Sequence, residues 1–252
     1  MLISIITEGF ATGDWRNLII QLLLMFPVVL FALSAHEAAH GLVAYIMGDR
    51  TAYNLGRVTL NPAKHLDPFG TLMMLVFGFG WAKPVPINAR NFKNPKWGMA
   101  LTAIAGPLSN MLFGAIGAIA AGTFLYFTEI IIRAYAPNIT EFAYYWALRS
   151  VLEDFVTYFG LINFIYAFFN LIPLPPFDGS RFFFTFLPPR WYFGIMKYER
   201  FIMFGVLILL MICSRLFNFS PFSFLAEHAY AGIVNGVLRA LQFAHVLIIN
   251  LI

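Results

Sequence analysis

Two histidines and a glutamate lie in the stretch LSAHEAAHGLVAY at Leu33–Tyr45, inside a run that is otherwise apolar enough for a membrane helix. His36 and His40 are four residues apart, so on a helix their imidazoles lie on one face, a turn apart, and can reach one metal ion. Glu37 lies beside them and can act on a water bound to that ion. Zinc is the predicted metal, because its catalytic sites combine three protein ligands with a position open to water.

Purely structural roles for these residues compete with the metal-site interpretation. A single histidine in a membrane helix often hydrogen-bonds to a neighbouring helix, and Glu37 could belong to a buried ion pair or a proton relay. Three ionisable groups are costly together in a membrane helix, so their spacing favours a bound ion. By contrast, His228 and His245 have no partner at a metal-binding spacing, and we expect them to be packing or interfacial residues.

The stretch NLIPLPPFDGSR at Asn170–Arg181 supplies a candidate third ligand in Asp178. Its prolines and its Asp-Gly pair cannot continue a regular helix. Unwound backbone at membrane depth is tolerated mainly where it lines a cavity or is buried in protein. An ordinary turn at the membrane surface is the competing interpretation, since Asp-Gly is a frequent turn pair. Because Cys213 is the only cysteine, a thiolate metal site is excluded.

The composition indicates which elements must position these residues. Of the 252 residues, 60% are hydrophobic and 11% are charged, and the mean hydropathy of +0.77 lies outside the range of soluble domains. We therefore predict an all-α polytopic membrane protein with one domain over residues 1–252 and a catalytic core at about 18–181. The net charge of +4 is better explained by topology signals in loops than by nucleic-acid binding, which we do not expect.

A helix needs about 20 apolar residues to cross the hydrocarbon core, which predicts a bundle of about five to six transmembrane helices. We predict spans near Leu18–Met47, Met99–Phe127, Val151–Leu174, Phe201–Phe217 and Tyr230–Ile252. The apolar run Phe69–Trp81 is too short to cross and contains three glycines, so we predict a re-entrant or extended segment near the active site. Glu8 and Asp14 precede the first span instead of a positive region, so we expect that span to stay in the mature protein.

Positive charge is unevenly divided among the loops and predicts the orientation of the spans. Basic residues gather in the loops after the first and the third spans: Arg50, Arg57, Lys64, Lys83, Arg90, Lys93 and Lys96, then Arg181, Arg190, Lys197 and Arg200. The intervening loop has only Arg133 and Arg149 among four acidic residues. Cytoplasmic loops are the ones enriched in Lys and Arg, so the N-terminus should face out and the candidate ligands should lie towards the cytoplasm.

These motifs resemble those of the site-2 protease family of intramembrane metalloproteases. Besides HEAAH, the stretch NLIPLPPFDG is similar to the family's Asn-x-x-Pro…Asp-Gly motif, and AGPLSN at Ala105–Asn110 is similar to its Gly-x-x-x-Asn motif. The segments GRVTLNPAKHLDPFGTL and GWAKPVPIN are similar to those of small bacterial members that lack PDZ and CBS domains. The matches follow the family's order from about Leu33 to Arg181.

The resemblance implies His36, His40 and Asp178 as zinc ligands and Glu37 as the catalytic base. It also implies that Asn110 and Asn170 shape the cleft or bind the substrate backbone. For Asn110 a packing role competes, because it belongs to a series of compact residues four apart that is typical of close helix packing: Gly106, Asn110, Gly114, Ala118 and Gly122.

The role of His65 and Asp67 stays open at this point. Both could contact the metal or one of its ligands, or they could simply form a turn near the membrane surface.

The implied function is an intramembrane zinc endopeptidase that cuts within or next to transmembrane segments of membrane-protein substrates, in a bacterial or archaeal plasma membrane. A helical substrate must unwind before attack, so the Pro-rich loops and Phe69–Trp81 are candidates for an edge that pairs with an extended substrate. The alternatives are a non-proteolytic zinc-binding membrane protein, either a metal transporter or a pseudo-protease scaffold. The sequence identifies neither a substrate nor an oligomeric state.

Overall fold

The structure is a computed structural model and describes residues 6, 9–70, 82–139, 143–216 and 220–251. Five long helices dominate these residues: α2 (Trp15–Ile46), α5 (Pro95–Ile139), α6 (Ala143–Asn170), α9 (Glu199–Leu216) and α10 (Pro221–Leu251). Short helical elements connect them: α3 (Thr51–Asn54), α7 (Asp178–Phe183), α8 (Pro189–Met196), and the 3-10 turns η1 (Pro62–Lys64), η2 (Ala89–Asn91) and η3 (Phe184–Phe186).

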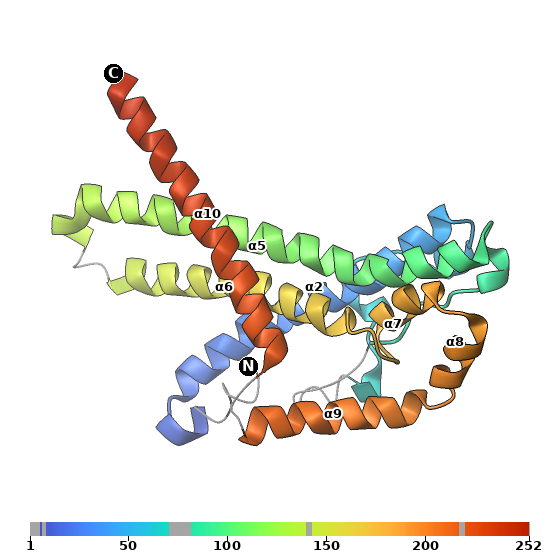
Figure 1. Ribbon diagram of the computed structural model, residues 1–252. Coiled ribbons are helices and arrows are strands. Elements are labelled where there is room, and N and C mark those ends of the chain that lie inside the picture. The colour runs from blue at the N-terminus through green and yellow to red at the C-terminus, as the bar shows by residue number, and fades with distance from the viewer. Residues whose placement is uncertain (1–5, 7–8, 71–81, 140–142, 217–219, 252) are drawn as a thin grey trace.

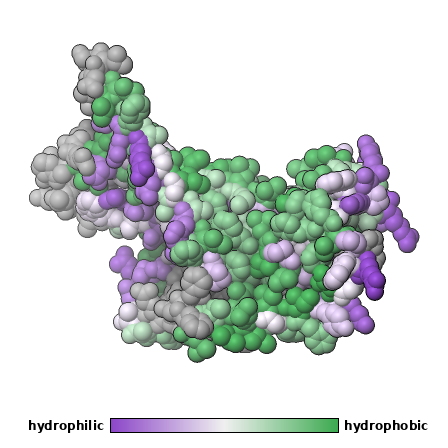
Figure 2. Space-filling view, in the orientation of Figure 1, coloured by the Kyte–Doolittle hydropathy of each residue, from purple (hydrophilic) through white to green (hydrophobic). Residues whose placement is uncertain are grey.

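Three of the long helices carry the membrane signal. Among the described residues, α2, α5 and α6 contain stretches long and apolar enough to cross a bilayer. They lie side by side, and hydrophobic residues fill the middle of the molecular face that Figure 2 shows, with hydrophilic residues towards its ends (Figures 1 and 2). The predicted all-α membrane architecture is confirmed. The two predicted C-terminal spans fall on α9 and α10, and the total number of spans stays a prediction.

The first long helix, α2, begins and ends at identifiable local signals. The Asp14 carboxylate caps its N-terminus by accepting a hydrogen bond from Asn17 N at 3.0 Å. At its C-terminal end, Gly48 has φ +114°, a conformation that an L side chain rarely adopts. This turn allows Asp49 N to donate to Ala44 O at 2.9 Å. The HEAAH motif therefore lies within the last three turns of a helix whose end is fixed by sequence.

Compact residues allow α5 to approach its neighbours closely. A Cβ atom added at Gly117 would lie 2.7 Å from Gly160 Cα on α6, and one at Gly114 would lie 2.8 Å from the Phe164 ring. Further along α5, a Cβ at Gly122 would lie 3.0 Å from Val237 Cβ on α10. The predicted packing role of the compact series on α5 is thus confirmed.

The chain direction brings the end of α6 to the active-site end of α2. Because α5 runs antiparallel to both, α2 and α6 run in the same direction, and α7 follows close to the HEAAH end of α2 (Figure 1). As predicted, the regular helix stops at Asn170 before the proline-rich stretch. Gly179 is required in the turn, since a Cβ there would collide with the Leu171 carbonyl. Asp178 is thereby placed at the first position of α7.

The flanks of the predicted re-entrant segment lie next to each other. Leu66 and Ala82 form an isolated antiparallel bridge, and Lys83 N donates to His65 O at 2.7 Å. The residues on either side of the predicted segment, His65–Leu66 and Ala82–Lys83, are therefore in contact. Residues 71–81 of the segment lie outside the described residues.

Candidate active site

Three side chains that could hold a metal ion converge from α2 and α7. One ligand atom from each of His36, His40 and Asp178 lies within 4.8 Å of the others. Asp178 Oδ2 is 2.9 Å from His36 Nε2 and 3.2 Å from His40 Nε2. Ligands of one tetrahedral zinc ion are separated by about 3.4 Å, given metal–ligand bonds of about 2.0–2.1 Å. The spacing of the three atoms therefore fits a shared zinc ion.

Hydrogen bonds fix which nitrogen of each imidazole faces the cluster. His36 Nδ1 lies 2.7 Å from Asn110 Oδ1, and His40 Nδ1 lies 2.7 Å from the Thr102 carbonyl oxygen. Both oxygens can only accept, so each Nδ1 carries a proton and donates it. In the neutral rings, Nε2 then presents a lone pair towards the Asp178 carboxylate. Three electron-pair donors that face one point are suited to a bound cation, and this donor set is one that zinc prefers.

Gly106 on α5 lies against the Nε2 atoms of both imidazoles, and its lack of a side chain leaves the space beside them open. A Cβ atom there would lie 2.5 Å from His40 Nε2 and 2.6 Å from His36 Nε2. Real Cβ atoms essentially never come so close, so any other residue would displace the imidazoles or occupy the space between them. The glycine therefore belongs to the metal site although it offers no ligand.

The charge state of Asp178 agrees with a ligand role. Burial raises the pKa of its carboxyl group, but hydrogen bonds from the two imidazoles and their positive charge outweigh burial and hold the pKa below the usual range. A metal cation in place of the imidazole Nε2 protons would act on the carboxylate in the same direction.

Glu37 is held by the backbone of a distant loop. Its Oε2 accepts a hydrogen bond of 2.9 Å from Val85 N, in the loop between Ala82 and η2. This bond restricts the rotamer of Glu37 and leaves Oε1 as the oxygen that can take a proton. A carboxylate anchored through one oxygen beside two candidate metal ligands is the arrangement expected of a general base.

The two predicted cleft asparagines differ in their surroundings. Asn110 is fully buried, and its amide donates to Ala32 O at 3.1 Å and to Asn163 Oδ1 at 2.9 Å. It combines the packing role with a role that we did not predict, the orientation of His36. Asn170 lies at the end of α6 and donates to Tyr166 O in its own helix at 3.1 Å. The contact of either side chain with substrate stays a prediction.

The remaining polar candidates have local partners. His65 is buried and donates from Nε2 to Thr59 O at 2.8 Å, while Asp67 accepts from Gly70 N at 2.8 Å. These bonds favour the turn interpretation for both residues. On α10, His228 lies 2.8 Å from Phe224 O through Nδ1, and the His245 ring lies 6.3 Å from that of Tyr126.

Four residues contribute to the site that the sequence analysis did not predict as site residues: Thr102, Gly106, Val85 and Asn163. Thr102 and Val85 act through backbone atoms, which every residue type shares, so no pattern could reveal them. Gly106 carried a signal in the AGPLSN motif, where it was assigned only to helix packing.

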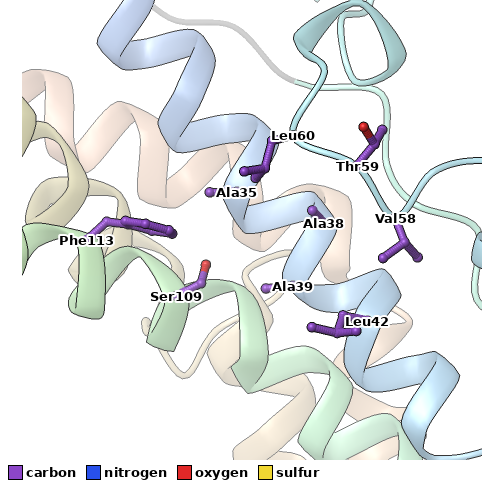
Figure 3. Close-up of a pocket in the computed structure, with 9 residues that line it drawn as sticks. All are labelled: Ala35, Ala38, Ala39, Leu42, Val58, Thr59, Leu60, Ser109 and Phe113. Carbon is purple, nitrogen blue, oxygen red and sulfur yellow. The ribbon is translucent and has the colours of Figure 1, made fainter.

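An apolar groove of about 330 Å³ lies on another face of α2. Figure 3 shows Ala35, Ala39 and Leu42 of α2 facing Ser109 and Phe113 of α5, with the 58–60 segment along one side. These α2 positions are offset by about 100° from the ligand pair on a regular helix, so the groove and the metal site use different faces.

Comparison with known proteins agrees with the metal geometry. Residues 22–213 match the model of a protein family described as Peptidase family M50. A protein of Bacillus subtilis (strain 168) named "Putative zinc metalloprotease YwhC" is 42% identical over 161 residues, which make up 64% of this chain and 68% of that protein. No solved structure matches the chain. The expected family is confirmed: the chain belongs to peptidase family M50, the site-2 protease family, and is a zinc metalloendopeptidase.

Proposed function

We propose that this protein cleaves membrane-protein substrates within or next to their transmembrane segments, with His36, His40 and Asp178 as zinc ligands and Glu37 as the general base. The observation that carries the proposal is the convergence of the three ligand atoms within 4.8 Å, in and beside a helix apolar enough to span a bilayer. Hydrolysis needs water at this depth, and we expect the broken backbone after α6 to line a cavity that admits it.

Each side chain has a defined part in the reaction. When bound, zinc polarises the scissile carbonyl and lowers the pKa of a coordinated water to about 7. Glu37 Oε1 accepts a proton from the attacking water, and Glu37 then returns it to the leaving amine nitrogen. Asn110 Oδ1 and Thr102 O keep the imidazoles of His36 and His40 turned towards the reaction centre.

The proposal extends to location and organisation. We infer a bacterial or archaeal plasma membrane, with the metal site towards the cytoplasm, because the basic loop between α2 and α5 follows directly on the HEAAH end of α2. Residues 1–252 act as one membrane domain with its catalytic core at about 18–181, since the ligands come from α2 and α7 at the two ends of that core.

Glu37→Gln is the decisive variant, because it removes the base and leaves all three ligands in place. The purified protein should keep its zinc and lose cleavage of a panel of single-span substrates in reconstituted vesicles. Glu227→Gln, at an exposed position of α10, is the matched control and should cleave normally. Unchanged cleavage in Glu37→Gln would refute the assignment of the base.

Metal analysis of His36→Ala, His40→Ala and Asp178→Ala tests the ligands separately, and each variant should lose zinc. A metal transporter would instead move zinc across vesicles and would not need Glu37 for proton transfer. A pseudo-protease scaffold would bind the substrates and leave them intact in the wild type. Both alternatives are therefore distinguished from the peptidase by the same preparations.

A further inference from the structure

The segment Lys83–Asn88 contacts Glu37 through one backbone N–H, although the segment has no regular secondary structure of its own. Val85 N–H is the donor to Glu37, and both neighbours of Val85 are prolines, which have no N–H to donate. Within Pro84–Pro86, Val85 N–H is therefore the one backbone donor available to the Glu37 carboxylate. Groups elsewhere in the fold have to hold the segment, because it belongs to no helix or sheet.

Arg57 holds the upstream side of this segment. Its Nη2 donates to the Lys83 carbonyl at 2.6 Å and to the Pro84 carbonyl at 3.3 Å, and the residue is only 8% exposed. Hydrogen bonds from a charged guanidinium to carbonyl groups are stronger than neutral ones. Arg57 is itself fixed, since its backbone N donates to Ala52 O of α3 at 2.9 Å. The two carbonyls directly before Val85 are thus anchored.

Asp49 holds the downstream side. This carboxylate is completely buried, and its Oδ2 accepts from Asn88 N at 2.7 Å. Its Oδ1 accepts from Thr51 N at 3.0 Å and from Asn91 Nδ2 at 2.8 Å. Asp49 lies three residues after Ile46, the last residue of α2, which is the helix that carries Glu37. The anchor therefore ties the loop back to the same helix whose side chain the loop must meet.

We propose that Asp49 and Arg57 are positioning residues for Glu37, and that they act by aiming Val85 N–H at its carboxylate. This inference rests on the proposed function of Glu37 as the base. A buried charge is costly unless hydrogen bonds satisfy it, and the hydrogen bonds that these two side chains form go mainly to the loop backbone and its neighbours. Catalytic groups need support from surrounding residues because small misplacements slow a reaction strongly.

A double-mutant cycle with Val85 tests this inference on the full-length protein in vesicles with a cleavable single-span substrate. Val85→Pro removes the N–H donor, and Val85→Ala keeps it. We expect Asp49→Asn, Arg57→Gln and Val85→Pro each to lower kcat by about 10-fold to 100-fold, with zinc content and KM unchanged. In the Val85→Pro background, Asp49→Asn and Arg57→Gln should lower kcat little further. In the Val85→Ala background, they should retain their full effect.

Three further variants complete the design. Arg57→Lys keeps the charge and should recover part of the kcat that Arg57→Gln loses. Asn91→Ala removes one donor from Asp49 while the carboxylate stays in place, so it tests the anchor even where Asp49→Asn fails to fold. Arg50→Gln changes an exposed arginine next to Asp49 and should cleave like the wild type.

Multiplicative losses in the Val85→Pro background would overturn the inference, as would losses confined to zinc content or KM. The proposed function fails in a different way: the wild type would cleave no substrate, or Glu37→Gln would cleave normally. The two failures are therefore distinguishable in one set of assays.

Discussion

Asn110 Oδ1 on α5 lies 2.7 Å from His36 Nδ1 on α2, and the asparagine side chain has no exposed surface. Its amide nitrogen is already engaged with Ala32 O and Asn163 Oδ1, so the oxygen must face the histidine. The asparagine thus sets the tautomer of His36 and joins α2, α5 and α6 at the depth of the metal site. Helix packing and ligand orientation depend on the same side chain.

Replacement of Asn110 by alanine should weaken zinc binding without removing a ligand. His36 would lose the acceptor that orients its ring, and loss of such a partner typically costs about 10-fold to 100-fold in metal affinity. Zinc retention measured against a series of chelator concentrations would show the change. Thr123→Ala, in the same helix at a hydroxyl that donates to Ile119 O one turn earlier, is the control. Equal zinc retention in both variants would contradict the orienting role.

Gly106→Ala should interfere with the metal site although it adds only a methyl group. The new Cβ would lie 2.5 Å from His40 Nε2 and 2.6 Å from His36 Nε2, in the space between the ligands. We expect the purified variant to contain much less zinc and to lose cleavage, while it remains folded and inserted. Gly232→Ala on α10, where nothing lies within 4 Å of the added atom, should keep its zinc. Full zinc occupancy in Gly106→Ala would show that the ligands lie elsewhere.

Gly179→Ala tests how Asp178 is delivered to the cluster. An added Cβ would collide with the Leu171 carbonyl and would lie 2.8 Å from Ile172 O, so the turn after α6 must open. Asp178 should move with it, and both zinc content and thermal stability should fall. Gly194→Ala in α8 meets no atom within 4 Å and serves as the matched substitution. A variant that binds zinc as the wild type does would exclude a requirement for this tight turn.

The buried carboxylate of Asp49 should make stability depend on acid. Burial raises its pKa, but hydrogen bonds from Thr51, Asn88 and Asn91 outweigh burial and lower the pKa below the ordinary value of 3.8. A carboxyl group whose pKa is lower in the folded state stabilises the fold at pH values above its unfolded pKa. This contribution is lost as the pH falls from the unfolded pKa through the folded pKa.

The measurement is the unfolding temperature of the detergent-solubilised protein between about pH 6 and about pH 3. Wild type should lose stability as the pH falls below 3.8. Asp49→Asn should start less stable at the higher pH and should lose less over the same interval. Parallel curves for the two proteins would argue against a stabilising role of the ionised Asp49.

Much of the site follows from short-range patterns. The four-residue spacing of His36 and His40 specifies a common helical face, because the helical period is fixed by backbone geometry. The end of α6 follows from the prolines after Asn170, which cannot continue a helix. The close packing along α5 follows from its compact residues four apart. In each case the pattern lies within one continuous segment of the chain.

The sequence by itself determined the membrane helices, the ligand types and the family motifs, since these depend on composition and local periodicity. Only the tertiary structure decided that Thr102 O orients His40, that Gly106 leaves room beside both imidazoles, and that Val85 N–H holds Glu37. These contacts join atoms far apart in sequence, and two of the three use backbone groups that are the same in nearly every residue. They arise from how the helices and the loop pack, and no local pattern encodes that arrangement.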